Sequence, residues 1–194
     1  MKICVSGFTS SGKSFFCKIL AEKFNLKYLS TSNILLKKCK TIRKNEDHFW
    51  IRENAWQINH MRKLNPKIDL NTDKEILQII NTNNNIIIDS WIAPYLYTDR
   101  DLFKIFIKAD LPARTNMAYK SCITKPFTKE ELRYRIIKKD KETIEIFKQI
   151  YNKNIEDLSV YDLIFDITNT YKNSSLTSTK LINLVNENKI KLSA

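Results

Sequence analysis

The chain of 194 residues is long enough for one domain with a sizeable core, and 43% of its residues are hydrophobic. No run approaches the roughly 18 uninterrupted apolar residues of a membrane-spanning helix, and the N-terminus lacks a signal-peptide pattern, so we expect a cytoplasmic protein without a membrane partner. The net charge of +12 suits a nucleic acid or a polyanionic nucleotide, but the lysines are spread over the whole length, which does not favour a dedicated nucleic-acid surface.

A phosphate-binding loop opens the chain. Gly7-Phe8-Thr9-Ser10-Ser11-Gly12-Lys13-Ser14 matches the pattern G-x-x-x-x-G-K-[ST] at every fixed position, between a predicted strand at 2–6 and a predicted helix at 15–24. The chain has only two glycines, and both lie at the fixed positions, where a missing Cβ lets backbone N–H groups surround phosphate oxygens. We therefore predict a triphosphate site in which Lys13 reaches the β- and γ-phosphates and the Ser14 hydroxyl holds Mg²⁺.

A helical segment is predicted between the second and third strands. The second strand, 26–29, is followed by Ser30-Thr31-Ser32-Asn33, whose side chains suit helix capping. Asn65-Pro66 separates the last two helices of the segment. The predicted helices are 34–39, 47–64 and 73–80.

A carboxylate follows the third predicted strand. Ile86-Ile87-Ile88 is a continuous apolar run, as expected for a central parallel strand, and Asp89 ends it. Ligands collect at the carboxyl ends of such strands. We predict that Asp89 holds a water on the Mg²⁺ bound by Ser14, and the alternative is a cap on the next turn.

The second half of the chain is predicted to contain two more strands and a lid. A strand at 102–108 precedes a helix from Leu111 to about Lys120, which carries Arg114 in its first turn. Thr128-Lys129-Glu130-Glu131 matches a capping box at the start of a long helix that runs to about Tyr151. Its first part is rich in cations and is the expected lid. The last elements are a strand at 161–167 and a helix at 177–190.

The order of elements predicts an α/β fold of the P-loop NTPase type, with a five-stranded parallel sheet flanked by helices. Because both glycines lie in the loop, no D-x-x-G switch or glycine-containing transporter signature can occur, which excludes common GTPases and ABC-type ATPases. A small kinase remains. We expect one domain, 1–194, with a helical acceptor-binding insertion at 31–82 and a lid region at 116–142.

Much of the chain resembles the cytidylate-kinase-like family of nucleoside monophosphate kinases, in its short archaeal-type form. The most discriminating segment is Asp157-Leu158-Ser159-Val160-Tyr161-Asp162-Leu163. The resemblance implies reversible phosphoryl transfer from ATP, with Mg²⁺, to CMP or dCMP. It implies small nucleotides as partners, and we expect a monomer. The other matching segments are 1–14, 28–33, 65–89, 107–114 and 150–167.

The resemblance also implies roles for individual residues. Lys13, Ser14 and Asp89 carry over as the phosphate- and metal-binding residues. Arg114, just before the lid region, is assigned to catalysis together with Lys13 and Asp89. Lys139 lies near the position of a lid arginine in the family, and we assign it to binding the nucleotide.

Four positions depart from the family pattern. Leu36 and Trp91 stand where two arginines usually clamp the acceptor phosphate, and Met117 and Ser121 stand at basic lid positions. Neither leucine nor tryptophan can replace the bidentate, permanently charged fork of arginine. The candidates for a substitute are Arg43, Arg62 and Arg100.

Two alternative functions stay open. An intact phosphate loop beside an altered acceptor site is also expected in a nucleotide-binding protein that has lost kinase activity and acts as a regulatory or interaction module. A basic nucleic-acid-associated NTPase is the less favoured alternative.

Two further residue types carry weaker signals. The tryptophans at 50 and 56 favour core packing over stacking on a base. The four cysteines show no C-x-x-C spacing, which favours free thiols over a disulfide or a zinc site. These cysteines are Cys4, Cys17, Cys39 and Cys122.

Overall fold

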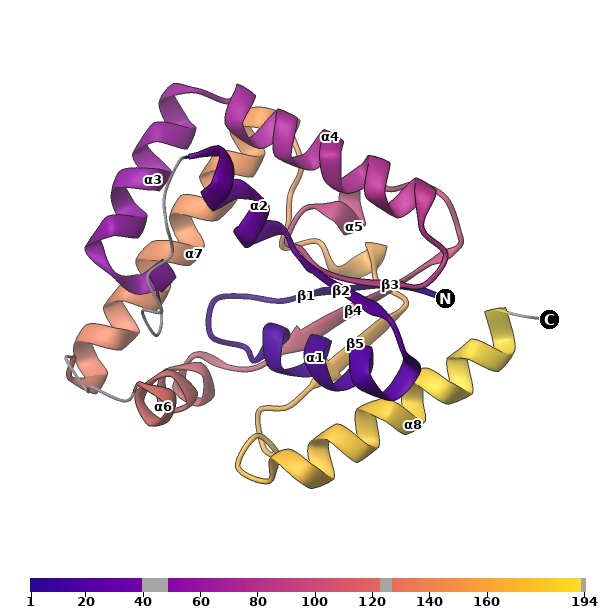
Figure 1. The fold of residues 1–194 in the computed structure, drawn as a ribbon. Coiled ribbons are helices and arrows are strands. Elements are labelled where there is room, and N and C mark those ends of the chain that lie inside the picture. Colours follow the sequence, from indigo (N-terminus) through magenta and orange to yellow (C-terminus); the bar gives the residue numbers. More distant parts are fainter. Residues whose placement is uncertain (40–48, 123–126, 193–194) are drawn as a thin grey trace.

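The computed structural model describes residues 1–39, 49–122 and 127–192, and its centre is a parallel sheet (Figure 1). The strand order is β2-β3-β1-β4-β5, so β1 lies in the middle. The predicted fold, a P-loop type α/β sheet flanked by helices, is confirmed. The strands are β1 (Lys2–Ser6), β2 (Lys27–Ser30), β3 (Ile86–Asp89), β4 (Leu102–Lys108) and β5 (Leu163–Asp166).

Helices cover both faces of the sheet (Figure 1). On one face, Ile3 and Val5 of β1 pack in one core cluster with side chains of α1 and α8. On the other face, Cys4 and Ile88 pack with Ile76 of α4. Burial of both strand faces explains why these strands read as continuous apolar runs. The covering helices are α1 (Lys13–Phe24), α2 (Thr31–Lys38), α4 (Lys67–Thr82), α5 (Ala93–Leu96) and α8 (Ser174–Leu192).

A group of helices stands beside the end of the sheet that carries the phosphate loop. In Figure 1, α3 and α7 run side by side there, with α6 next to the start of α7. The predicted capping box is confirmed, since Thr128 Oγ1 accepts from Glu131 N–H while the Glu131 carboxylate accepts from Thr128 N–H. The elements of this group are η1 (Phe49–Ile51), α3 (Glu53–Leu64), α6 (Leu111–Ser121) and α7 (Lys129–Tyr151).

Two predicted helix starts in the segment after β2 were wrong, and a third could not be compared. The helix after β2 begins at Thr31 instead of residue 34, and Ser30 makes no side-chain cap. The next predicted helix, 47–64, begins outside the described residues, and its described part is η1 followed by α3. The third begins at Lys67 instead of residue 73, because Pro66 at its N-cap, with φ of −58°, already has a helical backbone.

The four cysteines are free thiols, and three of them are buried. Within the part of the chain that the structure describes, no helix is both long and apolar enough to cross a membrane.

Candidate active site

The phosphate loop joins β1 to α1, and its two glycines have the backbone that only glycine adopts easily. Gly7 has φ of 150°, and a Cβ there would lie 2.5 Å from the carbonyl oxygen of Ile107. Gly12 has φ of 82°. Ser10 also has a positive φ, 62°, although it carries a side chain. Positive φ values at several residues of one short loop are typical of anion-binding concavities that backbone N–H groups line.

Lys13, Ser14 and Asp89 meet at this loop. The register of β1 with β3 pairs Val5 with Asp89, so the carboxylate lies beside the start of the loop. The Ser14 hydroxyl donates to Asp89 Oδ2 at 2.5 Å. The Lys13 ammonium donates to the carbonyl oxygen of Phe8 at 3.0 Å, and burial lowers its pKa.

The oxygens of Ser14 and Asp89 fit Mg²⁺. Magnesium prefers oxygen ligands and usually takes only one or two from the protein, with waters and substrate phosphates supplying the rest. The described residues contain no cluster of three or more His, Cys, Asp or Glu side chains that could hold a metal. A Mg²⁺ ion at Ser14 would therefore depend on the phosphates of a bound nucleotide.

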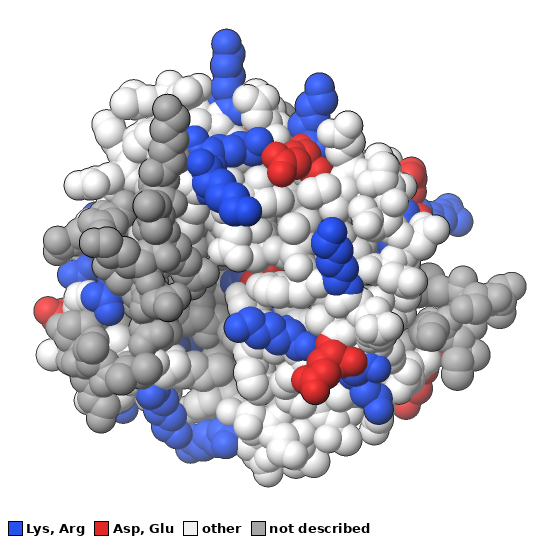
Figure 2. Space-filling view, in the orientation of Figure 1, with Lys and Arg blue, Asp and Glu red and all other residues white. Residues whose placement is uncertain are grey.

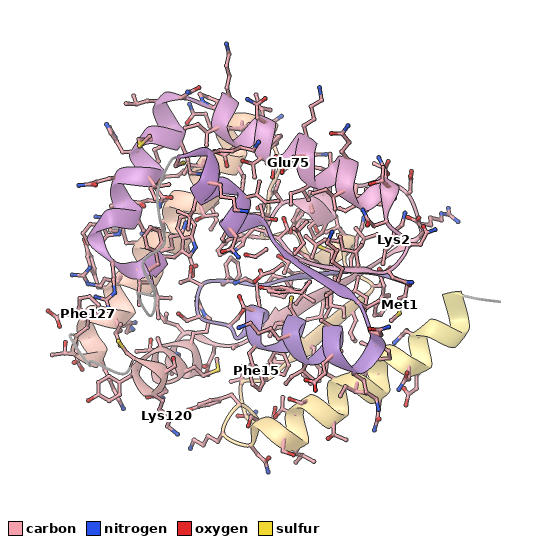
Figure 3. The ribbon with its side chains drawn as sticks, in the orientation of Figure 1. Met1, Lys2, Phe15, Glu75, Lys120 and Phe127 are labelled. Carbon is pink, nitrogen blue, oxygen red and sulfur yellow. The ribbon has the colours of Figure 1, made fainter. Side chains whose placement is uncertain are left out.

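A cavity of about 930 Å³ extends from the phosphate loop to the space between α3, α4 and α7. Phe15, on the first turn of α1 (Figure 3), lines it and is 47% exposed. Gly7, Phe8, Ser11 and Arg114 are not among the described residues that line the cavity. The predicted site residues that do line it are Thr9, Ser10, Gly12, Lys13, Ser14, Asp89 and Lys139.

The wall of the cavity that α3 and α4 form carries a buried ion pair that the sequence did not reveal. Arg62 Nε and Nη2 donate to the Asp69 carboxylate at 3.0 and 2.6 Å, and Nη1 donates to Asn59 Oδ1 at 3.1 Å. Arg62 and Asp69 are each 3% exposed, and both line the cavity. Of the three proposed substitute arginines, Arg62 therefore lies in the cavity.

Lys139 of α7 lies between the loop and this ion pair. Its ammonium donates to Thr143 Oγ1 at 2.8 Å, contacts Asn59 Oδ1 at 3.5 Å and lies 4.7 Å from the centre of the Trp50 ring. Burial, followed by the nearby Arg62 guanidinium, lowers the pKa of Lys139 to about 7. The side chain can therefore gain or lose its charge near neutral pH.

Asp73 is the second buried acid of this wall. It lies one turn after Asp69 on α4, lines the cavity, and accepts a short hydrogen bond from the Tyr151 hydroxyl. Burial raises the pKa of Asp73 to about 7. A sequence signal for both acids existed, because positions 69 and 73 share the buried face of α4 with Ile76 and Ile80.

Arg114, predicted to act in catalysis, lies outside the lining of the cavity. Its guanidinium is 9% exposed and donates to Asp140 Oδ2 of α7 at 2.6 Å and to the carbonyl oxygen of Thr9 at 3.1 Å. The structure thus brings Arg114 to the outer side of the phosphate loop.

The positions that depart from the family pattern fall into two groups. Leu36 packs into a buried cluster with Phe49, so that position has become part of the core. Trp91 lines the cavity, and its ring centre lies 5.3 Å from the Lys13 ammonium. Met117 and Ser121 also line it. Arg100 is exposed and does not belong to the described lining, and Arg43 lies outside the described residues.

Basic side chains do not form one stripe on the face shown in Figure 2. Lysines and arginines are scattered across it, with acidic side chains between some of them. The cation–π contacts of α7, such as Lys138 over the Trp56 ring at 3.6 Å, place several basic groups against half-buried aromatic rings instead.

Known proteins resemble the chain over nearly its whole length. The model of the cytidylate kinase-like family matches residues 2–169. A cytidylate kinase of Methanosarcina mazei is 33% identical over 170 residues, which cover 86% of this chain and 87% of the relative. A cytidylate kinase of Sulfolobus acidocaldarius is 31% identical over 166 residues, covering 86% and 85%.

Solved structures support the fold. An uncharacterized protein from Eubacterium ventriosum superposes with a TM-score of 0.67 at 14% identity, covering 96% of this chain and 98% of that one. A shikimate kinase from Bacteroides thetaiotaomicron has a TM-score of 0.53 at 16% identity, with the same coverage. The family match and the two archaeal relatives show that the chain belongs to the cytidylate kinase-like family and is a nucleoside monophosphate kinase by class.

Proposed function

We propose that this protein transfers the γ-phosphate of ATP, with Mg²⁺, to CMP or dCMP. The observation that supports the proposal most strongly is one cavity that joins the phosphate loop to the polar wall of Arg62, Asp69 and Asp73. A donor triphosphate at the loop and an acceptor monophosphate along the cavity would lie end to end, as in-line phosphoryl transfer requires.

The donor half rests on the loop. Backbone N–H groups of residues 10–14 would surround the phosphates, and the Lys13 ammonium would exchange the Phe8 carbonyl for phosphate oxygens. Ser14 and Asp89 would hold Mg²⁺, which when bound neutralises phosphate charge. The work of the chain is therefore to position the reactants and stabilise developing negative charge.

The acceptor half supports a cytosine base. Asp69 Oδ1 accepts from both Nε and Nη2 of Arg62, whereas Oδ2 accepts from Nε alone, which leaves Oδ2 able to accept from the exocyclic amino group of cytosine. A carboxylate favours that donor and disfavours uracil, which presents a carbonyl oxygen at the same position. Lys139 would contact the acceptor phosphate in place of the missing arginines.

The remaining assignments are proposals of the same kind. The chain forms a single kinase domain in this proposal, and that domain contains an acceptor-binding insertion at 31–82 and a lid region at 116–142. The predicted monomer and cytoplasmic location are compatible with this function.

The direct test is a coupled assay of ATP with CMP, dCMP, UMP, AMP and GMP. We expect turnover of CMP and dCMP and its loss in Lys13→Ala, with the fold of the variant checked by thermal unfolding. No turnover of any acceptor, combined with ADP binding in calorimetry, would favour the alternative of a nucleotide-binding protein without kinase activity.

Base recognition has its own test in Asp69→Asn. The amide can donate to the uracil carbonyl, so the ratio of kcat/KM for CMP to that for UMP should fall by roughly tenfold. The ratio is insensitive to partial unfolding, because both substrates are assayed on the same folded fraction. An unchanged ratio would contradict the assignment of Asp69 to the base.

A further inference from the structure

A carboxylate from α7 holds the phosphate loop from its outer side. Asp140 Oδ1 accepts from the backbone N–H of Thr9 at 3.0 Å, and Oδ2 accepts from Arg114 Nη1 at 2.6 Å. The same Nη1 donates to the Thr9 carbonyl oxygen at 3.1 Å. Both polar backbone groups of one loop residue are thereby bound. We call Thr9, Arg114 and Asp140 together the Thr9 clasp.

The Thr9 clasp is shielded from water. Thr9 and Asp140 are each 8% exposed and Arg114 is 9% exposed. The Phe8 ring packs against the guanidinium, with its centre 5.6 Å from Arg114 Cζ. Charge-assisted hydrogen bonds are short and directional, and partial burial protects them from screening by salt. The clasp therefore fixes the orientation of the Thr9 peptide groups.

The residue after Thr9 explains what this fixation is for. Ser10 has φ of 62°, a left-handed conformation that disfavours residues with a Cβ. Such a residue keeps this conformation only where its surroundings impose it. The left-handed turn at Ser10 lies between Thr9 and the N–H groups of residues 12–14, while the Ser11 N–H donates to the Phe8 carbonyl oxygen at 3.2 Å. The Thr9 clasp lies immediately before this strained turn.

We propose that Asp140 and Arg114 are positioning residues that hold the phosphate loop in its phosphate-binding conformation through Thr9. The lid region thereby acts on nucleotide affinity from the outer side of the loop, through α6 and α7. Arg114, in this role, acts through the loop backbone and not on the reacting phosphate.

The proposal rests on the donor half of the proposed function and is independent of the acceptor. It is tested by the affinity for ADP, measured by calorimetry on the full chain, so a failure of CMP turnover leaves the test intact. The variants are Asp140→Ala, Asp140→Asn and, on the solvent side of the same helix, Glu145→Gln as a control.

We expect Asp140→Ala to weaken ADP binding about tenfold, which corresponds to about 1.4 kcal/mol of binding free energy. Asp140→Asn keeps an oxygen acceptor for the Thr9 N–H but loses the charge that pairs with Arg114, so it should weaken binding less. Glu145→Gln should bind as the unchanged chain does. Where CMP turnover occurs, the KM for ATP should rise as well.

A second substitution separates positioning from general stability. Ser10→Gly removes the left-handed strain, so adding it to Asp140→Ala should restore most of the ADP affinity. Ser10→Ala keeps the strain and should not restore it. The proposal is overturned if a folded Asp140→Ala binds ADP within twofold of the unchanged chain, or if Ser10→Ala restores affinity as well as Ser10→Gly does.

Discussion

The charge of Lys139 should control the pH dependence of acceptor binding. Burial and the Arg62 guanidinium oppose the charged form, while Glu142, Asp140 and Asp69 favour it, and the resulting pKa is about 7. An acceptor phosphate needs the charged form. With a pKa of about 7, half of the lysines are charged at pH 7 and about one in ten at pH 8.

The size of the effect follows from this fraction. The apparent affinity of a ligand falls in proportion to the fraction of the binding-competent form, so the KM for CMP should rise about tenfold from pH 6 to pH 8 through Lys139 alone. In Lys139→Arg the guanidinium stays charged throughout, and this rise should disappear. In Lys139→Gln the side chain is uncharged at every pH. The KM for CMP should therefore be high, and this position should add no pH dependence to it.

The assay is the KM for CMP at saturating ATP and Mg²⁺, for the unchanged chain and the two variants at each pH. The phosphate of CMP and the Asp73 carboxyl also titrate in this range, but they do so in all three proteins, so the difference between the profiles isolates Lys139. If the unchanged chain and Lys139→Arg give profiles of the same shape, Lys139 does not bind the acceptor phosphate in its charged form.

Two further predictions concern the carboxylates. Asp89→Asn should raise the Mg²⁺ concentration that gives half-maximal rate by about tenfold, because it removes the negative charge beside Ser14. The assay is the rate as a function of Mg²⁺ concentration. An unchanged curve would contradict the assignment of Asp89 to the metal. Burial raises the pKa of Asp73 to about 7. Between about pH 4 and about pH 7, the folded state therefore keeps a proton on Asp73 that the unfolded state has lost. The free energy of unfolding should therefore fall as the pH rises through this range, by up to about 1.4 kcal/mol per pH unit, and urea titrations of Asp73→Asn should lack this part of the slope.

The donor half of the site could be predicted from the sequence because its geometry is local. Eight consecutive residues form the loop, and the rule that ligands collect at the carboxyl ends of parallel strands placed Asp89 beside it. The register of β1 with β3 confirms this placement, with Val5 opposite Asp89. The five-stranded parallel sheet and its flanking helices likewise follow from alternating elements and buried apolar runs.

The acceptor wall could not be predicted because its contacts depend on how the helices turn and pack against one another. Arg62 and Asp69 meet only because α3 and α4 turn back at Pro66, and the helix that carries Asp69 begins six residues earlier than its apolar pattern indicated. The contact between Asp140 and Thr9 spans 131 residues and follows no local pattern. The role of Arg114 in catalysis stays a prediction, and the contacts of Arg114 with Thr9 and Asp140 could not be predicted from the sequence.

The two lysines of the cavity lead to one more expectation. Burial lowers the pKa of both Lys13 and Lys139 in a cavity that also contains the acids Asp69 and Asp89. A bound phosphate dianion would favour their charged forms, so their pKa values should rise and binding should take up protons. At pH 8, where Lys139 is mostly neutral, CMP binding should take up close to one proton.

Calorimetry of CMP binding in buffers of different ionisation enthalpy measures this proton uptake. Because the CMP phosphate is already a dianion at pH 8, its own titration contributes little. Lys139→Arg should bind CMP without the uptake, since its guanidinium is charged before and after binding. CMP binding with no proton uptake in the unchanged chain would mean that the acceptor phosphate lies away from Lys139, and that the missing arginines are replaced by another group.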